Sequence, residues 1–196
     1  MTLPELSIII PTLNEAESLP LLLADLARQR EVAFEVVVSD GGSVDSTCTM
    51  AQGLFAAGKL SGNCVVGPRG RGRQLNLGVR DAKADWLLFL HADSRIGDEL
   101  QLRKALDFIF EYQQQQTGLM TAGRFLLAFD ARAEENRFAL FYYEAKARLG
   151  RPGCIHGDQG MLMTKACLQE AGWFREDLPV MEDTSIAEVI RTSGQW

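Results

Sequence analysis

Three acidic side chains of this sequence follow apolar runs that end in turns. Asp93 follows the run LLFL, Asp40 follows FEVVV, and Glu15 lies just beyond LSIII. If these runs are parallel strands, their carboxyl ends meet at one edge of a sheet and bring the carboxylates together. Asp40 could then accept N–H bonds from a nucleobase, and Asp93 could bind a divalent cation that meets phosphate. The alternative at each position is a turn aspartate that accepts only local backbone hydrogen bonds.

A glycine-rich stretch with three arginines follows a third short apolar run. Residues 67–72 have the pattern G-x-x-G-x-G, but they match neither the P-loop motif nor the dinucleotide-binding motif. Arg69, Arg71 and Arg73 are more informative, because guanidinium groups form paired hydrogen bonds with phosphate and a helix N-terminus adds N–H donors. Solvated loop arginines are the alternative.

The elements that must position these residues form an alternating pattern. Apolar runs predict strands at 6–10, 34–38, 63–66 and 87–90. Helical spacing occupies 19–30, 45–57 and the stretch from the arginines to about 83. Strands that alternate with helices predict an α/β fold with a mostly parallel central sheet flanked by helices.

The second half of the chain is expected to complete the domain. Helices are predicted at 98–115, at 132–149, from 165 and from about 182, with strands at 120–129 and 157–164. We expect one domain over 1–196.

Composition narrows the class of protein. The chain has 196 residues, 46% hydrophobic content, 23% charged residues and a net charge of −6, which favours a folded domain and argues against a nucleic-acid partner. The four cysteines form no C-x-x-C pair, so we expect reduced core thiols in a cytoplasmic protein. No apolar run reaches the roughly 20 residues of a membrane span, although peripheral membrane contact is compatible with the sequence.

Taken together, six segments resemble family 2 glycosyltransferases of the GT-A fold. They are 7–15 (SIIIPTLNE), 38–47 (VSDGGSVDST), 70–78 (GRGRQLNLG), 90–93 (LHAD), 157–160 (GDQG) and 181–183 (MED). The resemblance extends over roughly residues 5 to 191 and is closest to a bacterial subgroup with an H-A-D triplet. Family members usually continue beyond the last segment, so we expect the chain to be truncated at Trp196.

The resemblance implies a nucleotide-sugar site. The residues implied to line the nucleotide pocket are Pro11, Thr12, Glu15, Asp40, Arg73, Asn76 and Ala92. Asp93 matches the last aspartate of the family's D-x-D motif, which binds Mg²⁺ or Mn²⁺ at the diphosphate. His91 replaces the first aspartate, and it is either a further metal ligand or a hydrogen-bonded structural histidine.

The resemblance also implies an acceptor side, with a nucleotide-binding half at about 1–97 and an acceptor half at about 98–196. Asp183 matches the general base of inverting members, which removes the proton from the attacking hydroxyl. The alternative for Glu182 and Asp183 is stabilisation of a helix N-terminus. Asp158, Gln159 and Glu182 are implied to contact donor or acceptor, and Trp173 is expected either to stack on an acceptor ring or to lie in the core.

The resulting hypothesis is an inverting, metal-assisted glycosyltransferase that moves a sugar from a nucleotide diphosphate, with UDP as the expected nucleotide, to an acceptor hydroxyl. The acceptor is a glycan, a lipid or a small molecule. Two alternatives stay open: a non-catalytic nucleotide-sugar-binding module, and a sugar-phosphate nucleotidyltransferase. The second lacks its expected glycine-rich loop, because residues 11–15 (PTLNE) follow the first strand.

Overall fold

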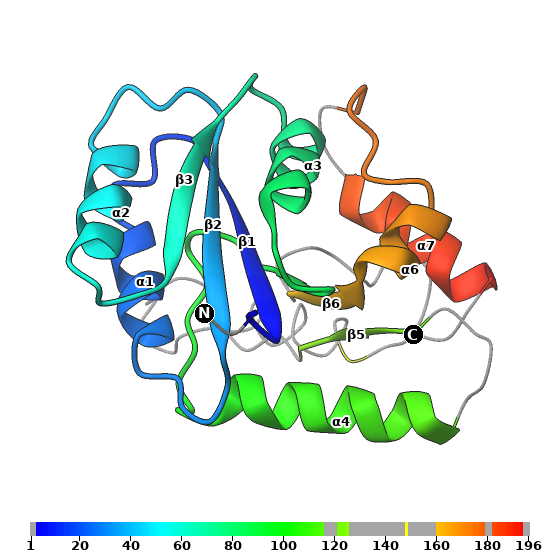
Figure 1. The fold of residues 1–196 in the computed structure, drawn as a ribbon. Helices are drawn as coiled ribbons and strands as arrows, with labels where there is room; N and C mark the ends of the chain where they lie inside the picture. Colours follow the sequence, from blue (N-terminus) through cyan, green and yellow to red (C-terminus); the bar gives the residue numbers. More distant parts are fainter. Residues whose placement is uncertain (1–2, 116–120, 126–147, 149–159, 179–181, 194–196) are drawn as a thin grey trace, which may run out of the picture.

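The described part of the chain is built around one mixed sheet. The computed structural model describes residues 3–115, 121–125, 148, 160–178 and 182–193. These residues form a six-stranded sheet in the order β3-β2-β1-β4-β6-β5, with helices on both of its faces (Figure 1). The strands are β1 Leu6–Thr12, β2 Phe34–Asp40, β3 Gly62–Val66, β4 Trp86–Phe89, β5 Ala122–Arg124 and β6 Met161–Thr164.

The predicted α/β class is confirmed. Strands β3, β2, β1 and β4 are parallel, β6 runs antiparallel to β4, and β5 runs antiparallel to β6. The parallel strands follow from near-continuous apolar runs, which suit a sheet buried on both faces.

The helices agree with the predicted pattern except near their ends. They are α1 Leu19–Leu26, α2 Thr47–Ala56, α3 Arg71–Asp81, α4 Gln101–Gln115, α6 Lys165–Glu170 and α7 Glu182–Ser193. Helix α1 ends four residues earlier than predicted, and α4 begins three residues later. Asp98 explains the second difference, because its carboxylate accepts a hydrogen bond from the Leu100 N–H and its carbonyl accepts one from Gln101. The predicted helix at 132–149 lies almost wholly outside the described residues.

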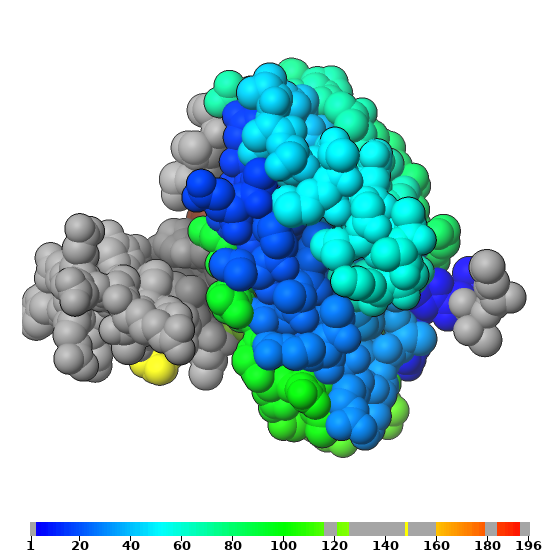
Figure 2. Space-filling view, turned by 90° about the vertical axis from the view of Figure 1, so that its left-hand side faces the viewer, coloured from blue at the N-terminus to red at the C-terminus, as the bar shows by residue number. Residues whose placement is uncertain are grey.

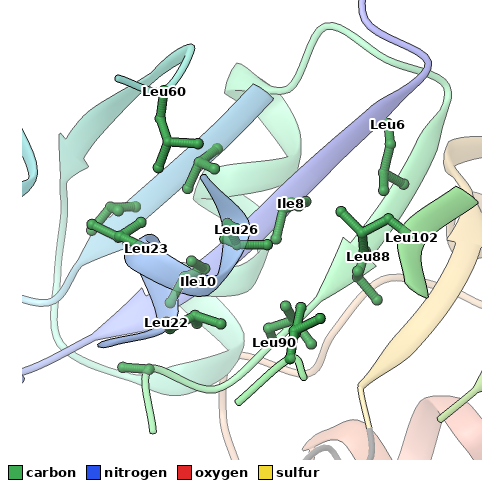
Figure 3. Close-up of a cluster of buried hydrophobic side chains, with 14 of the residues drawn as sticks. Leu6, Ile8, Ile10, Leu22, Leu23, Leu26, Leu60, Leu88, Leu90 and Leu102 are labelled. Carbon is green, nitrogen blue, oxygen red and sulfur yellow. The ribbon is translucent and has the colours of Figure 1, made fainter. Parts of the chain in front are cut away.

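Side chains of β1 alternate between two cores. Leu6, Ile8 and Ile10 point to one face, where they pack against the leucines of α1 and against Leu102 of α4 (Figure 3). All of these side chains are essentially inaccessible to solvent. Figure 2 shows the outer side of this layer, where the N-terminal elements in blue and cyan form one continuous surface with α4, in green, below. The period-two alternation of a strand therefore assigns alternate β1 residues to opposite cores.

The opposite face of the sheet is covered by α3, α6 and α7. Ile9 of β1 belongs to this second core, together with Leu75 and Val79 of α3. Helix α3 approaches β1 very closely at Gly78, where an added Cβ would lie 2.5 Å from Ile9 Cγ2. A glycine at this position therefore sets the distance between α3 and the sheet.

The direction of the chain reverses at β1. From β1 the chain moves outward through β2 to β3, and it then returns to place β4 on the other side of β1. In open α/β sheets, such a topological switch point opens a crevice beyond the carboxyl ends of the two diverging strands. Here that crevice lies beyond β1 and β4, so the fold itself predicts where a ligand binds.

Gly78→Ala should destabilise the protein by about 1 to 3 kcal/mol, because the added methyl group forces α3 away from Ile9. The matched control is Gly53→Ala in α2, where an added Cβ meets no atom within 4 Å. This control should be neutral or should stabilise the protein by about 0.5 to 1 kcal/mol. Urea unfolding of the three proteins measures both effects, and equal stability of the two variants would contradict the close-packing explanation.

Candidate functional site

A cavity opens at the switch point between β1 and β4. Its volume is about 230 Å³. Its lining residues are Pro11, Thr12, Leu13, Glu15, Arg71, Gln74, His91, Ala92 and Asp93. They come from the end of β1, the start of α3 and the turn after β4, which are three segments far apart in the sequence. The predicted convergence of Glu15 and Asp93 at one edge of the sheet is therefore seen.

Asp40 holds the ends of β1 and β2 together. The two strands pair Thr12 with Asp40, and the Thr12 hydroxyl donates a hydrogen bond of 3.0 Å to Asp40 Oδ1. The other carboxylate oxygen, Oδ2, accepts hydrogen bonds from the Gly42 and Ser43 N–H groups. Burial alone would raise the pKa of Asp40, but the donors on Ser43, Thr12 and Gly42 hold it below its usual value. Asp40 is 1% exposed and does not line the cavity.

The loops after β1 and β2 are joined by reciprocal hydrogen bonds. The Asn14 N–H donates to Ser43 Oγ, and the Val44 N–H donates back to Asn14 Oδ1. The Glu15 N–H donates to Thr47 Oγ1 at 2.9 Å. Asn14 has a φ of 57°, a left-handed conformation that asparagine tolerates better than most residues. One wall of the cavity is thus a pair of loops that fix each other.

Gln74 of α3 forms hydrogen bonds with the carboxyl ends of β1 and β2, on the face of the sheet that α3 covers. Its buried amide nitrogen donates to the Thr12 carbonyl at 2.7 Å and to the Ser39 carbonyl at 3.0 Å. Residue 41 must be small here, because a Cβ on Gly41 would lie 2.9 Å from the Gln74 side chain. Gln74 therefore couples the position of α3 to the carboxyl ends of β1 and β2.

The turn that carries Asp93 begins directly after β4. The Leu90 N–H donates to the Ile9 carbonyl, which extends the pairing with β1, and the Ser94 N–H donates to the His91 carbonyl. His91 is partly buried, Ala92 is buried, and the Asp93 side chain is exposed at the cavity. Among the described residues, the Asp93 carboxylate has no hydrogen bond or ion pair. It is therefore open to a ligand, in contrast to Asp40.

A buried carboxylate anchors the far end of this turn. Asp25 of α1 accepts hydrogen bonds from Arg95 Nε at 2.6 Å, from Arg95 Nη2 at 3.1 Å and from the Ile96 N–H at 3.1 Å. The Arg95 guanidinium and the Ile96 N–H outweigh the effect of burial and lower the pKa of Asp25. The Asp25–Arg95 pair is two residues from Asp93, so it fixes the path of the turn.

Besides Asp40, two further residues expected at the nucleotide do not line the cavity. Arg73 is exposed on α3 and does not line the cavity. Asn76 is buried, and its side chain bonds to the backbone of Phe174 and to the Glu176 carboxylate. Its amide therefore holds the segment after α6 against α3.

The predicted acceptor-side residues lie only partly within the described residues. Trp173 has a φ of 67° and packs partly against the second core, in agreement with the core alternative. Glu182 and Asp183 are the first two residues of α7, a helix that packs on α3. Asp158 and Gln159 lie outside the described residues.

Sequence analysis assigned neither Leu13 nor Gln74 to the site, and it named Arg71 only as one of three arginines that could bind phosphate. The signal for Arg71 and Gln74 is helical spacing, because residues three apart share one face of a helix. Once α3 is known to begin at Arg71, the cavity-facing pair is Arg71 and Gln74, and Arg73 points elsewhere. The prediction placed the start of the helix after 69–73, so the helical interval between Arg71 and Gln74 was not recognised.

A larger cavity, of about 630 Å³, lies between α4 and β5 and shares no lining residue with the first. Its walls are mainly apolar and aromatic, with Phe108, Ile109 and Phe125 among them. The carboxylates of the switch point are absent from its lining, so the smaller cavity is the better candidate for chemistry.

Two further findings on the described residues concern metal binding by protein ligands alone and membrane-spanning helices. Within them, no group of three or more His, Cys, Asp or Glu side chains is arranged to hold a metal ion by protein ligands alone. Among the helices of that part of the chain, none combines the length and the apolar content needed to cross a bilayer.

Comparison with known proteins decides the family. The profile of the family described as "Glycosyl transferase family 2" matches residues 7–167. The chain belongs to glycosyl transferase family 2. The region matched by the family profile contains β1 from its second residue, β2 to β6 and the whole cavity lining.

Relatives of this family 2 chain are named as glycosyltransferases. A PGL/p-HBAD biosynthesis glycosyltransferase of Mycobacterium bovis is 40% identical over 116 residues, which are 58% of this chain and 44% of the relative. A dolichyl-phosphate beta-glucosyltransferase of Mus musculus is 25% identical over 150 residues, which are 70% of this chain and 46% of that protein. The chain thus spans less than half the length of these relatives.

Solved structures show the same fold. S. aureus TarS 1–349 in complex with UDP has a TM-score of 0.75 and 20% identity, over 98% of this chain and 57% of that one. The mannosyltransferase PcManGT from Pyrobaculum calidifontis, in complex with GDP-Man and Mn²⁺, has a TM-score of 0.73 and 21% identity, over 100% of this chain and 55% of that one. The family 2 chain therefore has the GT-A fold.

Asp25→Asn should lower stability at neutral pH by about 2 kcal/mol, because charge-assisted hydrogen bonds from Arg95 and Ile96 are weakened. The folded-state pKa of Asp25 lies below its unfolded value of about 3.9, so its contribution is present above that value and is lost as pH falls through the folded-state pKa. Urea unfolding as a function of pH should therefore show the variant and the wild type converging below about pH 4.

Asp107→Asn serves as the control, because Asp107 is 58% exposed in its pair with Arg103. Its stability should stay within about 0.5 kcal/mol of wild type at neutral pH. A constant gap between Asp25→Asn and wild type at all pH values would refute the linkage.

Proposed function

We propose that this protein is an inverting glycosyltransferase that transfers a sugar from a nucleotide-diphosphate donor, with UDP as the nucleotide, to an acceptor hydroxyl. The observation that carries the proposal is the open Asp93 carboxylate in the switch-point cavity, beside Arg71 and Glu15. The other carboxylate at this edge, Asp40, is engaged by its own loop. One open and one engaged carboxylate indicate separate roles in ligand binding and in shaping the site.

On the nucleotide side, the walls of the cavity accept the base and ribose. Pro11, Thr12, Glu15 and Ala92 form these walls. Asp40 acts through its bonds to Thr12 and to the Ser43 N–H, which set the shape of the wall beside the base. Support for UDP comes from the structural neighbour TarS, which was solved with UDP.

On the diphosphate side, the charges of the cavity require a cation. Glu15 and Asp93 bring two carboxylates against the single guanidinium of Arg71, so the lining by itself would repel a diphosphate. Mg²⁺ is commonly held by one or two carboxylates together with substrate phosphates and water, which an exposed Asp93 fits. When bound, Mg²⁺ or Mn²⁺ would neutralise charge on the departing diphosphate. The Mn²⁺ complex of the neighbour PcManGT supports this assignment.

Arg71 complements the cation. It opens α3 at the cavity, next to the N–H groups of the first turn of that helix, and no acidic residue lies in that turn. Guanidinium and helix N–H donors together favour phosphate oxygens. His91, which also lines the cavity, lies in the turn that carries Asp93 and is a second candidate ligand for the cation.

On the acceptor side, Asp183 is the proposed general base. It is the second residue of α7, a helix that packs against α3, and α3 carries Arg71 and Gln74 of the cavity lining. The acceptor oxygen attacks the anomeric carbon from the face opposite the diphosphate, its proton passes to the carboxylate, and the bond to the diphosphate breaks. Attack from the opposite face inverts the anomeric configuration. Asp158, Gln159 and Glu182 are proposed to contact the donor sugar or the acceptor.

Asp93→Ala should weaken UDP binding in the presence of Mn²⁺ by about 10- to 100-fold, because the cation loses its protein ligand. Isothermal titration calorimetry with UDP and with GDP, each with and without Mn²⁺, measures the effect. The matched control is Asp85→Ala, an exposed aspartate at the other end of the same strand, which should bind as wild type does. Absence of UDP binding by the wild type, or equal binding by Asp93→Ala, would overturn the donor-site assignment.

Asp183→Asn should retain the affinity for UDP and Mn²⁺ while transfer falls by about 10²- to 10⁴-fold, because only the proton acceptor is lost. Nucleotide release from a panel of UDP- and GDP-sugars, followed together with UDP titration, separates the two properties. A variant that loses affinity and turnover together would contradict the role as base. A wild type that binds nucleotide but never turns over any donor would favour the non-catalytic binding module.

A further inference from the structure

Two cysteines 16 positions apart in the sequence meet beside the candidate site. Cys48 is the second residue of α2, and Cys64 is the central residue of β3, where it pairs with Val38 of β2. Their Sγ atoms are 2.7 Å apart. Both side chains are partly exposed, so that a reagent in solution can reach them. Neither residue is used by the proposed transfer reaction.

The separation of the two sulfur atoms lies between a covalent bond and a non-bonded contact. It exceeds the bond length of about 2.05 Å in a disulfide, but it is shorter than the contact of two sulfur atoms that merely touch. The start of α2 and the middle of β3 are packed elements, so the fold itself holds the two thiols together. We propose that Cys48 and Cys64 form a reversible disulfide that fastens the start of α2 to β3.

The reaction requires an oxidant, and a low-molecular-weight disulfide such as oxidised glutathione is sufficient. The Cys48 thiolate attacks that disulfide, forms a mixed disulfide and releases one thiol. The Cys64 thiolate then attacks the Cys48 sulfur and releases the second thiol. The two protein thiols lose two protons and two electrons, which convert the reagent disulfide into two thiols, and excess reducing thiol reverses both steps.

The surroundings of the pair set the order of attack and its pH dependence. Burial raises the pKa of the Cys48 thiol, and burial with the neighbouring Cys48 raises that of Cys64 much further. Cys48 is therefore the first nucleophile. Once Cys48 carries the mixed disulfide, its thiolate no longer opposes ionisation of Cys64. Oxidation should be slow at neutral pH and should accelerate as pH rises, because the thiolate is the reactive form.

The crosslink has a local structural consequence. Cys48 directly follows Thr47, whose hydroxyl accepts the hydrogen bond from the Glu15 N–H. It also follows directly on residues 41–47, which include the N–H donors that engage Asp40. A covalent link from Cys48 to β3 therefore restrains one wall of the cavity.

The test begins with the full chain, incubated with oxidised glutathione at alkaline pH and digested without reduction. Mass spectrometry should find the peptides of Cys48 and Cys64 joined, with the loss of two hydrogen atoms. Cys64→Ser should instead stop at a stable glutathione adduct on Cys48. Cys167→Ser is the matched control, because Cys167 is buried and burial raises its pKa to about 11. This control should crosslink Cys48 to Cys64 as the wild type does.

A second measurement tests the fastening itself. Hydrogen exchange of the amides of residues 41–47 should slow when the wild type is oxidised, and it should not slow in Cys64→Ser treated in the same way. Glutathione adducts without a crosslink, or a crosslink of either residue to Cys154 or Cys167, would overturn the pairing. A crosslink that leaves exchange in 41–47 unchanged would overturn the fastening. Both readouts are independent of the proposed transferase activity.

Discussion

The burial of β1 on both faces and both edges is the constraint on which the rest of the structure depends. Its apolar side chains pack into two cores, one on each face of the sheet. Its neighbours β2 and β4 form backbone hydrogen bonds with it along both edges. A strand that is fully enclosed can present functional groups only at its ends. Because the chain diverges from β1 toward β2 and later returns as β4, the carboxyl end of β1 is also the place where the covering loops separate. The cavity is thus a result of strand order.

Carboxylates near this end divide into two kinds according to how they are satisfied. Asp40 and Asp25 are buried and accept several hydrogen bonds, so each defines the path of a loop. Asp93 is exposed at the cavity and has no such donors among the described residues. Buried charge is tolerated only when it is well compensated, and a compensated carboxylate has little capacity left for a ligand. The contrast supports the proposal that Asp93 faces the ligand and that the other two carboxylates support the loops around it.

Most of the sheet could be predicted from the sequence because buried parallel strands leave continuous apolar runs. Those runs also placed Glu15, Asp40 and Asp93 at one edge. The role of Asp40 was harder to predict, since its hydrogen bonds come from Thr12 of another strand and from the loop that follows. Arg73 was predicted near the nucleotide, whereas Arg71 lines the cavity. Which arginine faces the cavity depends on where α3 begins, and the start of a helix is hard to predict where glycines interrupt the helical pattern. The contact of Cys48 with Cys64 depends on how α2 packs on β3, which no local pattern reveals.

His91 leaves the cavity lining less negative than a carboxylate at the same position would. A carboxylate at this position would make the lining more negative, which would strengthen attraction for a divalent cation and also increase repulsion of the diphosphate. With histidine at this position, the lining keeps two carboxylates against one guanidinium. A cation at the proposed donor site would then be held less by the protein and more by the phosphates, as is usual for Mg²⁺. Metal and nucleotide should therefore bind in a strongly interdependent manner, each weakly without the other.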